Sequence, residues 1–315
     1  MTTNKQSGLG DNFFIGGYDL SGDVSALSQI SGGPVALDVT GIKSSAHERI
    51  GGLRSGDMQF TSFFEFSGAG SAPSFPGSGT AVTSSYPVPA LAVITGGTVG
   101  TVNVNGGSAG TGDGAYLIPP LGSISAAYTG DPSWTWTLQG TEHDFLSTLP
   151  RTDTIACYFR GTTLLNPTAS LFGRQLDYDP TRDATGNLTM AVEAQSDGYG
   201  LEWGVQLTAG LRTDITGTSG AYVDDNGGSS SFGAQAYLQI IEFAGTSVDV
   251  VIEDSAASGS GYASLIDFGS QTGIGAWRGA VTGAVDRYLK VVTSGTFDYV
   301  TFAVAWTRNQ TAVSF

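Results

Sequence analysis

Apolar and polar residues alternate with a period of two in several stretches of the chain, which is the pattern of a half-buried β-strand. In the segment 57–66, DMQFTSFFEF, Met58, Phe60, Phe64 and Phe66 share one parity, whereas Gln59, Thr61 and Glu65 occupy the other. We therefore predict a strand that buries one face and leaves the other face polar.

Two later segments follow the same rule. In LEWGVQL the polar parity holds Glu202, Gly204 and Gln206. The apolar parity, which we expect to be buried, holds Leu201, Trp203, Val205 and Leu207. The segment TIACYFRG predicts a strand with an apolar face made of Ile155, Cys157 and Phe159.

Turn-forming residues separate further β-favouring segments. FFIGGYDLSG and ALDVTGI indicate strands near the N-terminus, and SLFGRQLDY and NLTMAVEAQ flank the long turn DPTRDATG. Beyond residue 231, five more β segments follow at the close, turn-punctuated spacing that is typical of a compact β-sandwich.

Two short helices are predicted as well. The first spans Ser45–Ile50, where Ser45 and Glu48 have the spacing of a capping box and a glycine pair follows. The second spans Thr141–Leu149, where Thr141 caps the first turn and a proline follows the last residue.

The chain is therefore predicted to be all-β, with two domains. Residues 1–216 form a β-sandwich or half-barrel with one or two short helices. They are interrupted at 67–140 by a Gly, Ser and Thr-rich insertion, read as an ordered, loop-rich surface segment with one or two hairpins. Residues 217–231 are expected to be a linker, and residues 232–315 a C-terminal β-sandwich.

Composition and charge narrow the function. The chain has 315 residues, of which 40% are hydrophobic and only 13% charged, with 47 glycines, so it can bury a core and is rich in turns. Its formal net charge is -15, which excludes a nucleic-acid binder that works by neutralising phosphates. The polar N-terminal segment predicts no secretory signal peptide. No apolar run approaches the ~18 residues of a membrane helix, so membrane insertion is not expected.

Candidate chemistry is sparse. Asp177, Asp179 and Asp183 form the densest acidic cluster, but Pro180 and Arg182 interrupt the spacing of a calcium loop, so turn formation explains them better. Cys157 lies near His143 in sequence, yet its place on an apolar strand face predicts a buried thiol with a raised pKa. We predict no catalytic residues, no cofactor and no metal site, and therefore no enzyme.

Other polar and aromatic residues have ordinary explanations. His47 is expected at the surface, and four acidic residues are expected to be solvated: Asp224, Asp225, Glu253 and Asp254. Five aromatic residues after 232 could form a platform that stacks sugars, although the parity of Tyr299 against Trp306 assigns part of the set to the core. The five are Tyr237, Trp277, Tyr288, Tyr299 and Trp306.

Several strings resemble the major tail, or tail tube, proteins of long-tailed phages that infect actinobacteria. The resemblance covers residues 8–66 and 141–215 and rests on GGYDLSGDVSALSQI, ALDVTGIKSSAHERIGGLRSGDMQFTSFFE, LSTLPRTDTIACYFRG, QLDYDPTR and GYGLEWGVQLTAGLRTD. VDVVIEDSA and RYLKVVTSGTF resemble the sandwich that such proteins carry outside the tube. The insertion at 67–140 departs from that pattern, in which the connection is short.

This resemblance implies a structural virion protein without enzymatic activity. Its copies would form rings, usually hexamers, that stack into a hollow tube around a tape-measure protein and meet tail-terminator and baseplate proteins. The sheet of each copy would join that of its neighbour through open edges, and DNA would pass through the lumen without specific binding. An acidic subunit suits such a conduit, because a negative lumen repels phosphate. The protein would be made in the host cytoplasm and reside in the phage tail.

Two alternatives stay open on the sequence. In the first, the chain is a minor tail or decoration protein whose C-terminal sandwich or insertion binds glycans of the host surface. In the second, it is a glycosidase, because the separation of paired carboxylates exists only in the fold.

Overall fold

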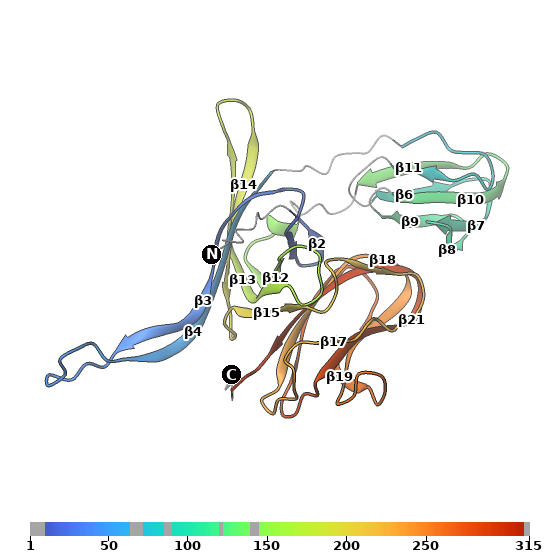
Figure 1. Ribbon diagram of the computed structural model, residues 1–315. Coiled ribbons are helices and arrows are strands. Elements are labelled where there is room, and N and C mark those ends of the chain that lie inside the picture. The colour runs from blue at the N-terminus through green and yellow to red at the C-terminus, as the bar shows by residue number, and fades with distance from the viewer. Residues whose placement is uncertain (1–9, 64–71, 85–89, 120–121, 139–144, 312–315) are drawn as a thin grey trace, which may run out of the picture.

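The computed structural model describes residues 10–63, 72–84, 90–119, 122–138 and 145–311 (Figure 1). Within these ranges nearly all regular structure is β, with antiparallel pairing throughout, and helix occurs only at residues 145–146. The prediction of an all-β chain is confirmed.

The N-terminal body is built around one long strand, β13 (Pro167–Arg182). The first half of β13 pairs with β12 on one side and with β15 on the other, and its second half pairs with β14. From β14 the sheet continues to β4 and then to β3, while β12 leads to β1 and β2. The other strands of the body are β1 (Asn12–Ile15), β2 (Tyr18–Asp19), β3 (Val24–Asp38), β4 (Arg49–Phe63), β12 (Arg151–Phe159), β14 (Leu188–Ser196) and β15 (Glu202–Gln206).

Apolar residues from both faces of β12 enter separate cores. Ala156 packs in the core of the body with Met58, Phe60 and Leu171. The face predicted from sequence, Ile155, Cys157 and Phe159, packs in a second cluster with Tyr237 and other residues of the C-terminal part. The predicted apolar face of this strand is therefore confirmed, and the strand is buried on its other face too.

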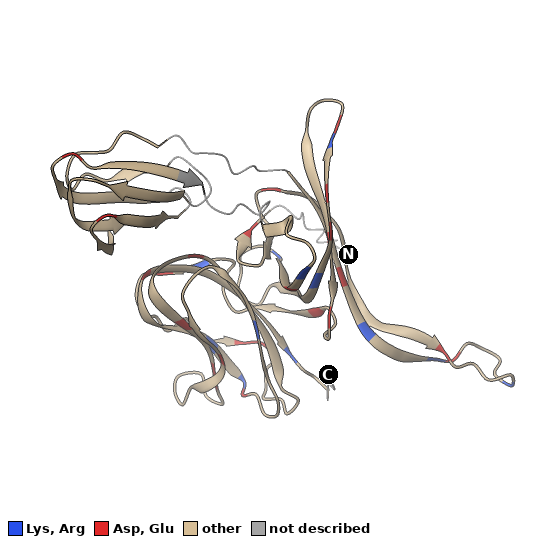
Figure 2. Ribbon diagram, turned by 180° about the vertical axis from the view of Figure 1, so that it is seen from behind, with Lys and Arg blue, Asp and Glu red and all other residues tan. Residues whose placement is uncertain are grey.

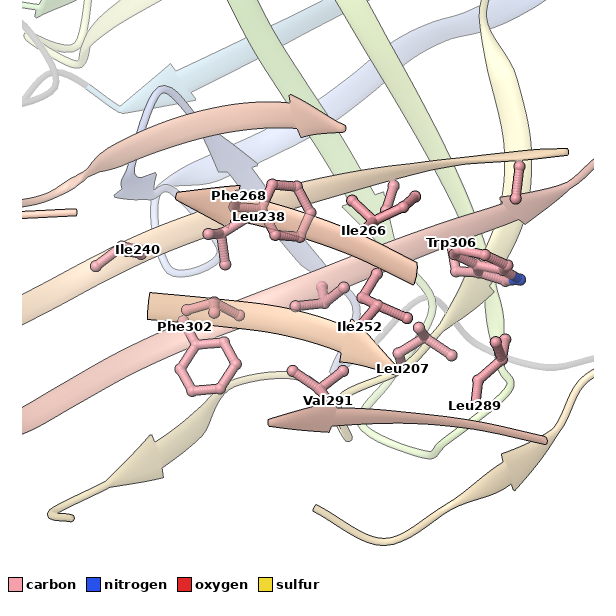
Figure 3. Packing of buried hydrophobic residues seen from close by; sticks show 14 of the residues in the cluster. Leu207, Leu238, Ile240, Ile252, Ile266, Phe268, Leu289, Val291, Phe302 and Trp306 are labelled. Atoms are coloured by element: carbon pink, nitrogen blue, oxygen red, sulfur yellow. The ribbon is translucent and has the colours of Figure 1, made fainter. Parts of the chain in front are cut away.

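The C-terminal part is a sandwich centred on two long strands, β18 (Ala234–Ser255) and β21 (Tyr288–Arg308), which pair along nearly their whole length. Both strands bend at register shifts near Gly245, so that each contributes to two layers. Branched and aromatic side chains fill the space between the layers (Figure 3). The remaining strands are β16 (Arg212–Asp214), β17 (Val223–Asp224), β19 (Ala263–Gln271) and β20 (Gly275–Val281).

The segment 217–231, assigned to a linker from its composition, runs beside the sandwich. β17 pairs with the start of β21, Ser219 forms a bridge with Val292, and Ser230 forms one with Val285. The Gly and Ser residues of this segment are therefore found in turns and also where its backbone lies close to that of the sandwich.

The insertion contains strands in two small sheets that enclose a core of their own (Figure 1). Trp134 and Trp136 from one sheet pack with Val102 and Ile124 from the other. It thus folds as a separate sandwich, with more β structure than the one or two hairpins predicted. Its strands are β5 (Val82–Thr83), β6 (Ala90–Thr95), β7 (Thr98–Val104), β8 (Gly107–Thr111), β9 (Gly114–Ile118), β10 (Ser123–Thr129) and β11 (Ser133–Leu138).

The helix predicted at Ser45–Ile50 is wrong, because these residues lie at the end of a β-hairpin where β4 begins. Asp38 pairs with Arg49 across the ribbon, and the backbone N–H of Glu48 donates to Thr40 Oγ1 at 2.9 Å. A six-residue helix could not compete with these bonds, since short helices are marginal without packing. Of the helix predicted at Thr141–Leu149, residues 141–144 lie outside the described residues, 145–146 are helical, and 147–149 form a turn and a bend, so the predicted end of the helix is wrong.

Buried polar contacts join the body to the C-terminal sandwich. Gln239 of β18 accepts a hydrogen bond from the backbone N–H of Gly17 at 2.8 Å and donates to the carbonyl of Ile155 at 3.1 Å. Each contact links residues far apart in sequence, so the two parts are fastened by more than the chain that connects them.

For LEWGVQL, the prediction that the odd-numbered residues are buried and the even-numbered residues exposed is wrong in the middle of the segment. Glu202 and Gln206 are buried, whereas Trp203 is 54% exposed. Glu202 is buried because Arg278 and Tyr237 of the C-terminal sandwich satisfy its carboxylate. Leu201 and Leu207, at the two ends, are buried as expected.

Candidate assembly surfaces

Among the described residues, two long segments of the body sheet, in β3 and in β13, are paired on one side only. Within the described residues, β3 pairs with β4 only, which leaves its outer edge open from Val24 to Asp38. On the far side, the pairing of β13 with β12 ends at Gln175, so in the described part of the chain residues 176–182 pair on the β14 side alone. The strands β3, β4, β14 and the end of β13 therefore form a sheet that is open at both borders.

The two faces of this open sheet differ sharply. Met58 and Phe60 of β4 and Met190 and Val192 of β14 are buried on one face, against the body core. The register places Gln59 beside Glu193 and Thr61 beside Ala191 on the opposite face. The prediction that Met58 and Phe60 are buried is confirmed, while Phe64 and Phe66 lie outside the described residues.

Carboxylates gather on the polar face. Asp177 lies across from Glu193, Asp179 follows two residues later on the same side, and Asp57 lies across from Gln195. Partial burial, followed by repulsion from Glu193, raises the pKa of Asp57. Burial also raises the pKa of Asp177, with further repulsion from Asp179 and Glu193. Burial is the larger cause of both shifts, and the repulsion shows that these carboxylates lie close to one another on this face.

A few hydrogen bonds order the acidic face. The backbone N–H of Glu193 donates to Asp177 Oδ1 at 2.8 Å, and Gln195 Nε2 donates to Glu193 Oε1 at 2.7 Å. Arg174, at the end of the face, is held by Asp197 at 2.5 Å. Figure 2 shows the acidic positions along these strands.

The distal half of the β3–β4 hairpin, residues 34–54, projects away from the body and is called the arm here (Figure 1). It exposes large apolar side chains: Val35, Leu37, Val39, Ile42, Ile50 and Leu53. Its charges are Lys43, Arg49 and Arg54 against Asp38 and Glu48, so it is slightly cationic in a chain with a net charge of -15. A two-stranded ribbon with this much exposed apolar surface is expected to be covered by a partner.

Polar contacts fix the tip of the arm. The backbone N–H of Thr40 donates to Asp38 Oδ1, and His47 Nδ1 lies 2.9 Å from Asp38 Oδ2. Bonds from the Thr40 side chain and backbone, with a smaller contribution from His47, lower the pKa of Asp38. His47 is exposed, as predicted.

The three aspartates considered for calcium have separate roles. Asp183 caps the turn at the end of the β13–β14 hairpin, where it accepts bonds from the backbone of Thr185 and Asn187. Asp177 and Asp179 lie on the acidic face of the sheet instead. In the described part of the chain, no group of three or more His, Cys, Asp or Glu side chains is placed to hold a metal.

The thiol of Cys157 is fully buried, and this burial raises its pKa to about 11. The sequence prediction for this residue is confirmed. His143, its neighbour in sequence, lies outside the described residues.

The prediction that Asp225 is solvated is wrong. Its carboxylate accepts hydrogen bonds from Arg308 Nη2 at 2.7 Å and from Trp306 Nε1 at 2.8 Å, and the side chains of this ion pair are only 4% and 2% exposed. The other acids expected at the surface are also paired or bonded. Asp224 binds Arg287, Glu253 binds Lys290, and Asp254 accepts a bond from the backbone N–H of Asp286.

The aromatic residues considered as a sugar platform do not form one. Tyr237, Tyr299 and Trp306 are buried in the structure, in agreement with the partial core assignment, and only Trp277 and Tyr288 keep intermediate exposure.

No protein-family model matches the chain, and no curated protein matches it. Among solved structures, the crystal structure of the SPP1 Dit protein, described as a hub of the adsorption apparatus in phages infecting Gram-positive bacteria, aligns with 95% of this chain and 99% of its own. The two share 8% sequence identity and a TM-score of 0.26, which is too low to carry an inference. In the described ranges, no helix has the length and apolar character needed to cross a bilayer.

Proposed function

We propose that this chain is a phage tail tube protein, whose copies join edge to edge into closed rings that stack around a channel for DNA. The observation that carries the proposal is the sheet formed by β3, β4, β14 and the end of β13, which is open at both borders and acidic on one face. The sequence resemblance covers the same strands.

The open edge of β3 is suited to pairing with another copy. Soluble proteins protect such edges with charged side chains, prolines or covering loops. Residues 24–33 contain no charged residue and no proline, so the first ten residues of β3 lack that protection. The open part of β13, residues 176–182, would receive the β3 edge of the neighbour and extend the sheet from copy to copy. This segment carries charged residues and Pro180, which has no N–H to donate, so the uncharged β3 edge is the one that favours the pairing.

The acidic face then becomes the lining of the channel. When the sheet closes into a ring, its buried face already packs on the body core, so the face with Asp57, Asp177 and Glu193 turns to the lumen. A negative lining repels phosphate and leaves the passing DNA free of contacts that retard it.

The arm supplies a second contact between copies. Its apolar side chains need cover, and its slight positive charge favours the acidic surface of another copy of this chain. The remaining partners implied by the resemblance, a tape-measure protein and tail-terminator and baseplate proteins, belong to the same proposal, as do the location in the virion and the absence of enzymatic activity.

The test compares the oligomeric state of three full-length proteins by sedimentation velocity. The wild type is expected to form rings or stacks. Ser28→Lys places a cation on the exposed β3 edge and is expected to yield monomers, because an edge lysine opposes strand addition. Ser270→Lys, at an exposed position of strand β19 in the sandwich, is the matched control and is expected to assemble like the wild type. A monomeric wild type, or equal behaviour of the two variants, contradicts the proposal.

A further inference from the structure

A cleft of about 370 Å³ opens between the insertion and the C-terminal sandwich. Its volume lies at the small end of the ~300–1,000 Å³ range of ligand pockets, which often form where domains meet. One wall comes from β7, β8 and β9 of the insertion, and the other from the bends of β18 and β21 and from Thr272.

The two walls touch at a tight turn of the insertion. Asn105 and Gly106 both have positive φ, 49° and 84°, as a two-residue hairpin turn requires. The next residue, Gly107, lies against Asp298, and a Cβ at this position would be 2.4 Å from Asp298 Cγ. The close approach therefore depends on a glycine and sets the shape of the cleft.

The cleft is lined by apolar surface on both walls. Phe243 and Phe297 contribute partly exposed phenyl rings from the sandwich, and Leu117 of the insertion is 49% exposed. Aromatic rings and an exposed leucine provide a surface on which the apolar C–H face of a ring can pack.

Free polar groups line the same cleft. The side chains of Ser108, Thr246, Thr272 and Thr296 and the carboxylate of Asp298 border it, and none has a hydrogen-bond partner among the described residues. Hydroxyl groups both donate and accept, and a carboxylate accepts strongly. Among the described residues that line the cleft there is no lysine or arginine, so an anionic ligand would meet the uncompensated negative charge of Asp298.

We infer that this cleft binds a neutral sugar unit. A pyranose ring has an apolar face for the phenyl rings and hydroxyl groups for the threonines, Ser108 and Asp298, whereas a phosphate or a carboxylate would be repelled. The site differs from the aromatic set considered on the sequence, and it does not depend on ring assembly.

The test uses the full chain and saturation-transfer NMR, with glucose, galactose, rhamnose and N-acetylglucosamine as separate probes and inorganic phosphate as the charged probe. We expect at least one neutral sugar to bind and phosphate not to bind. Asp298→Asn keeps the shape of the cleft and is expected to weaken sugar binding roughly tenfold, because a bond to a charged group is lost.

A second variant blocks the cleft without touching a core. Ser108→Trp puts a bulky ring at an exposed position of the wall and is expected to abolish binding. Phe232→Ala removes an exposed phenyl ring elsewhere and is expected to bind like the wild type. The inference is overturned if no neutral sugar binds, if phosphate binds equally well, or if binding persists in both Asp298→Asn and Ser108→Trp with unchanged affinity.

Discussion

At the scale of single residues, the junction between body and sandwich depends on a buried charged group. Tyr237 Oη donates to Glu202 Oε2 at 2.6 Å, and Arg278 Nη2 donates to Glu202 Oε1 at 3.3 Å. The Arg278 guanidinium also lies 3.7 Å from the centre of the Tyr199 ring. Burial, followed by the charge of Glu202, raises the pKa of Tyr237, so its hydroxyl stays protonated and donates.

Removing one partner of this group should cost more than removing both. Arg278→Met leaves the Glu202 carboxylate buried without its cation and is expected to lower the free energy of unfolding by about 3–5 kcal/mol. The double variant Arg278→Met with Glu202→Gln should recover much of that loss. Urea unfolding measures both values, and a loss below about 1 kcal/mol for the single variant would show that the pair contributes little.

The surroundings of some residues can be predicted from the local sequence, whereas those of others cannot, for a physical reason. Cys157 was located correctly because its apolar neighbours in the strand reveal its face. Asp225 and Glu202 were missed because their partners, Arg308 and Arg278, lie 83 and 76 residues away along the chain. A charged residue shows its burial only through a partner that the local pattern does not contain.

The buried thiol gives a second prediction at this scale. Because burial raises the pKa of Cys157 to about 11, the reactive thiolate is nearly absent at neutral pH. We expect no reaction with a thiol-specific reagent in the native protein and one equivalent of reaction in urea. Rapid labelling of the native protein would place the thiol in an accessible environment.

At the scale of elements, the β-hairpin of the arm could not be predicted from the sequence. The capping-box spacing of Ser45 and Glu48 is real, but Ser44 Oγ donates to Glu48 Oε1 at 2.9 Å and the tip is closed by bonds between Asp38, Thr40 and Glu48. A local capping signal does not reveal that the flanking segments pair with each other. The acidic face, in contrast, could be predicted from the sequence. Asp57 and Glu193 lie on the polar parity of the alternating segments 57–61 and 189–195.

The apolar residues of the arm should matter for assembly and not for folding. Replacing both Ile42 and Leu53 by Ser removes exposed apolar surface, so the free energy of unfolding is expected to change by less than about 0.5 kcal/mol. Self-association should weaken. Ile274→Ser, at an exposed position of the sandwich, is the control and should assemble like the wild type. Sedimentation velocity measures the self-association of the three proteins. Unchanged association of the arm variant would exclude the arm from the interface.

The acidic face predicts a defined dependence on pH. Since the pKa of Asp57 is raised in the folded chain, its ionised form opposes folding at neutral pH, and this cost disappears as the pH falls through the folded pKa. Asp57→Asn should therefore raise the melting temperature at neutral pH, and the gain should vanish below about pH 4.

A matched substitution separates this effect from a general loss of charge. Asp267→Asn lies at an exposed position of β19 and should not reproduce the gain at neutral pH. A lower melting temperature of Asp57→Asn at neutral pH would mean that the ionised carboxylate stabilises the fold.

At the scale of the whole molecule, the chain has separate cores for the body, the insertion and the C-terminal sandwich. The insertion has no lysine or arginine from 67 to 140, which Figure 2 shows as a part without blue positions. Its Gly, Ser and Thr-rich composition signalled turns, but the register that assembles its strands into two sheets comes from pairings such as β6 with β9 and β11. Amino-acid composition does not determine which strands pair, so the two sheets could not be predicted from it.

The most direct test of edge-to-edge assembly is an electron cryomicroscopy map of the purified full-length protein. We predict closed rings or tubes in which β3 of one copy lies beside residues 176–182 of the next, with Asp57 and Glu193 facing the central hole. A persistent monomer at high concentration would contradict the account. So would an assembly in which the β3 edge stays open or the acidic face turns outward.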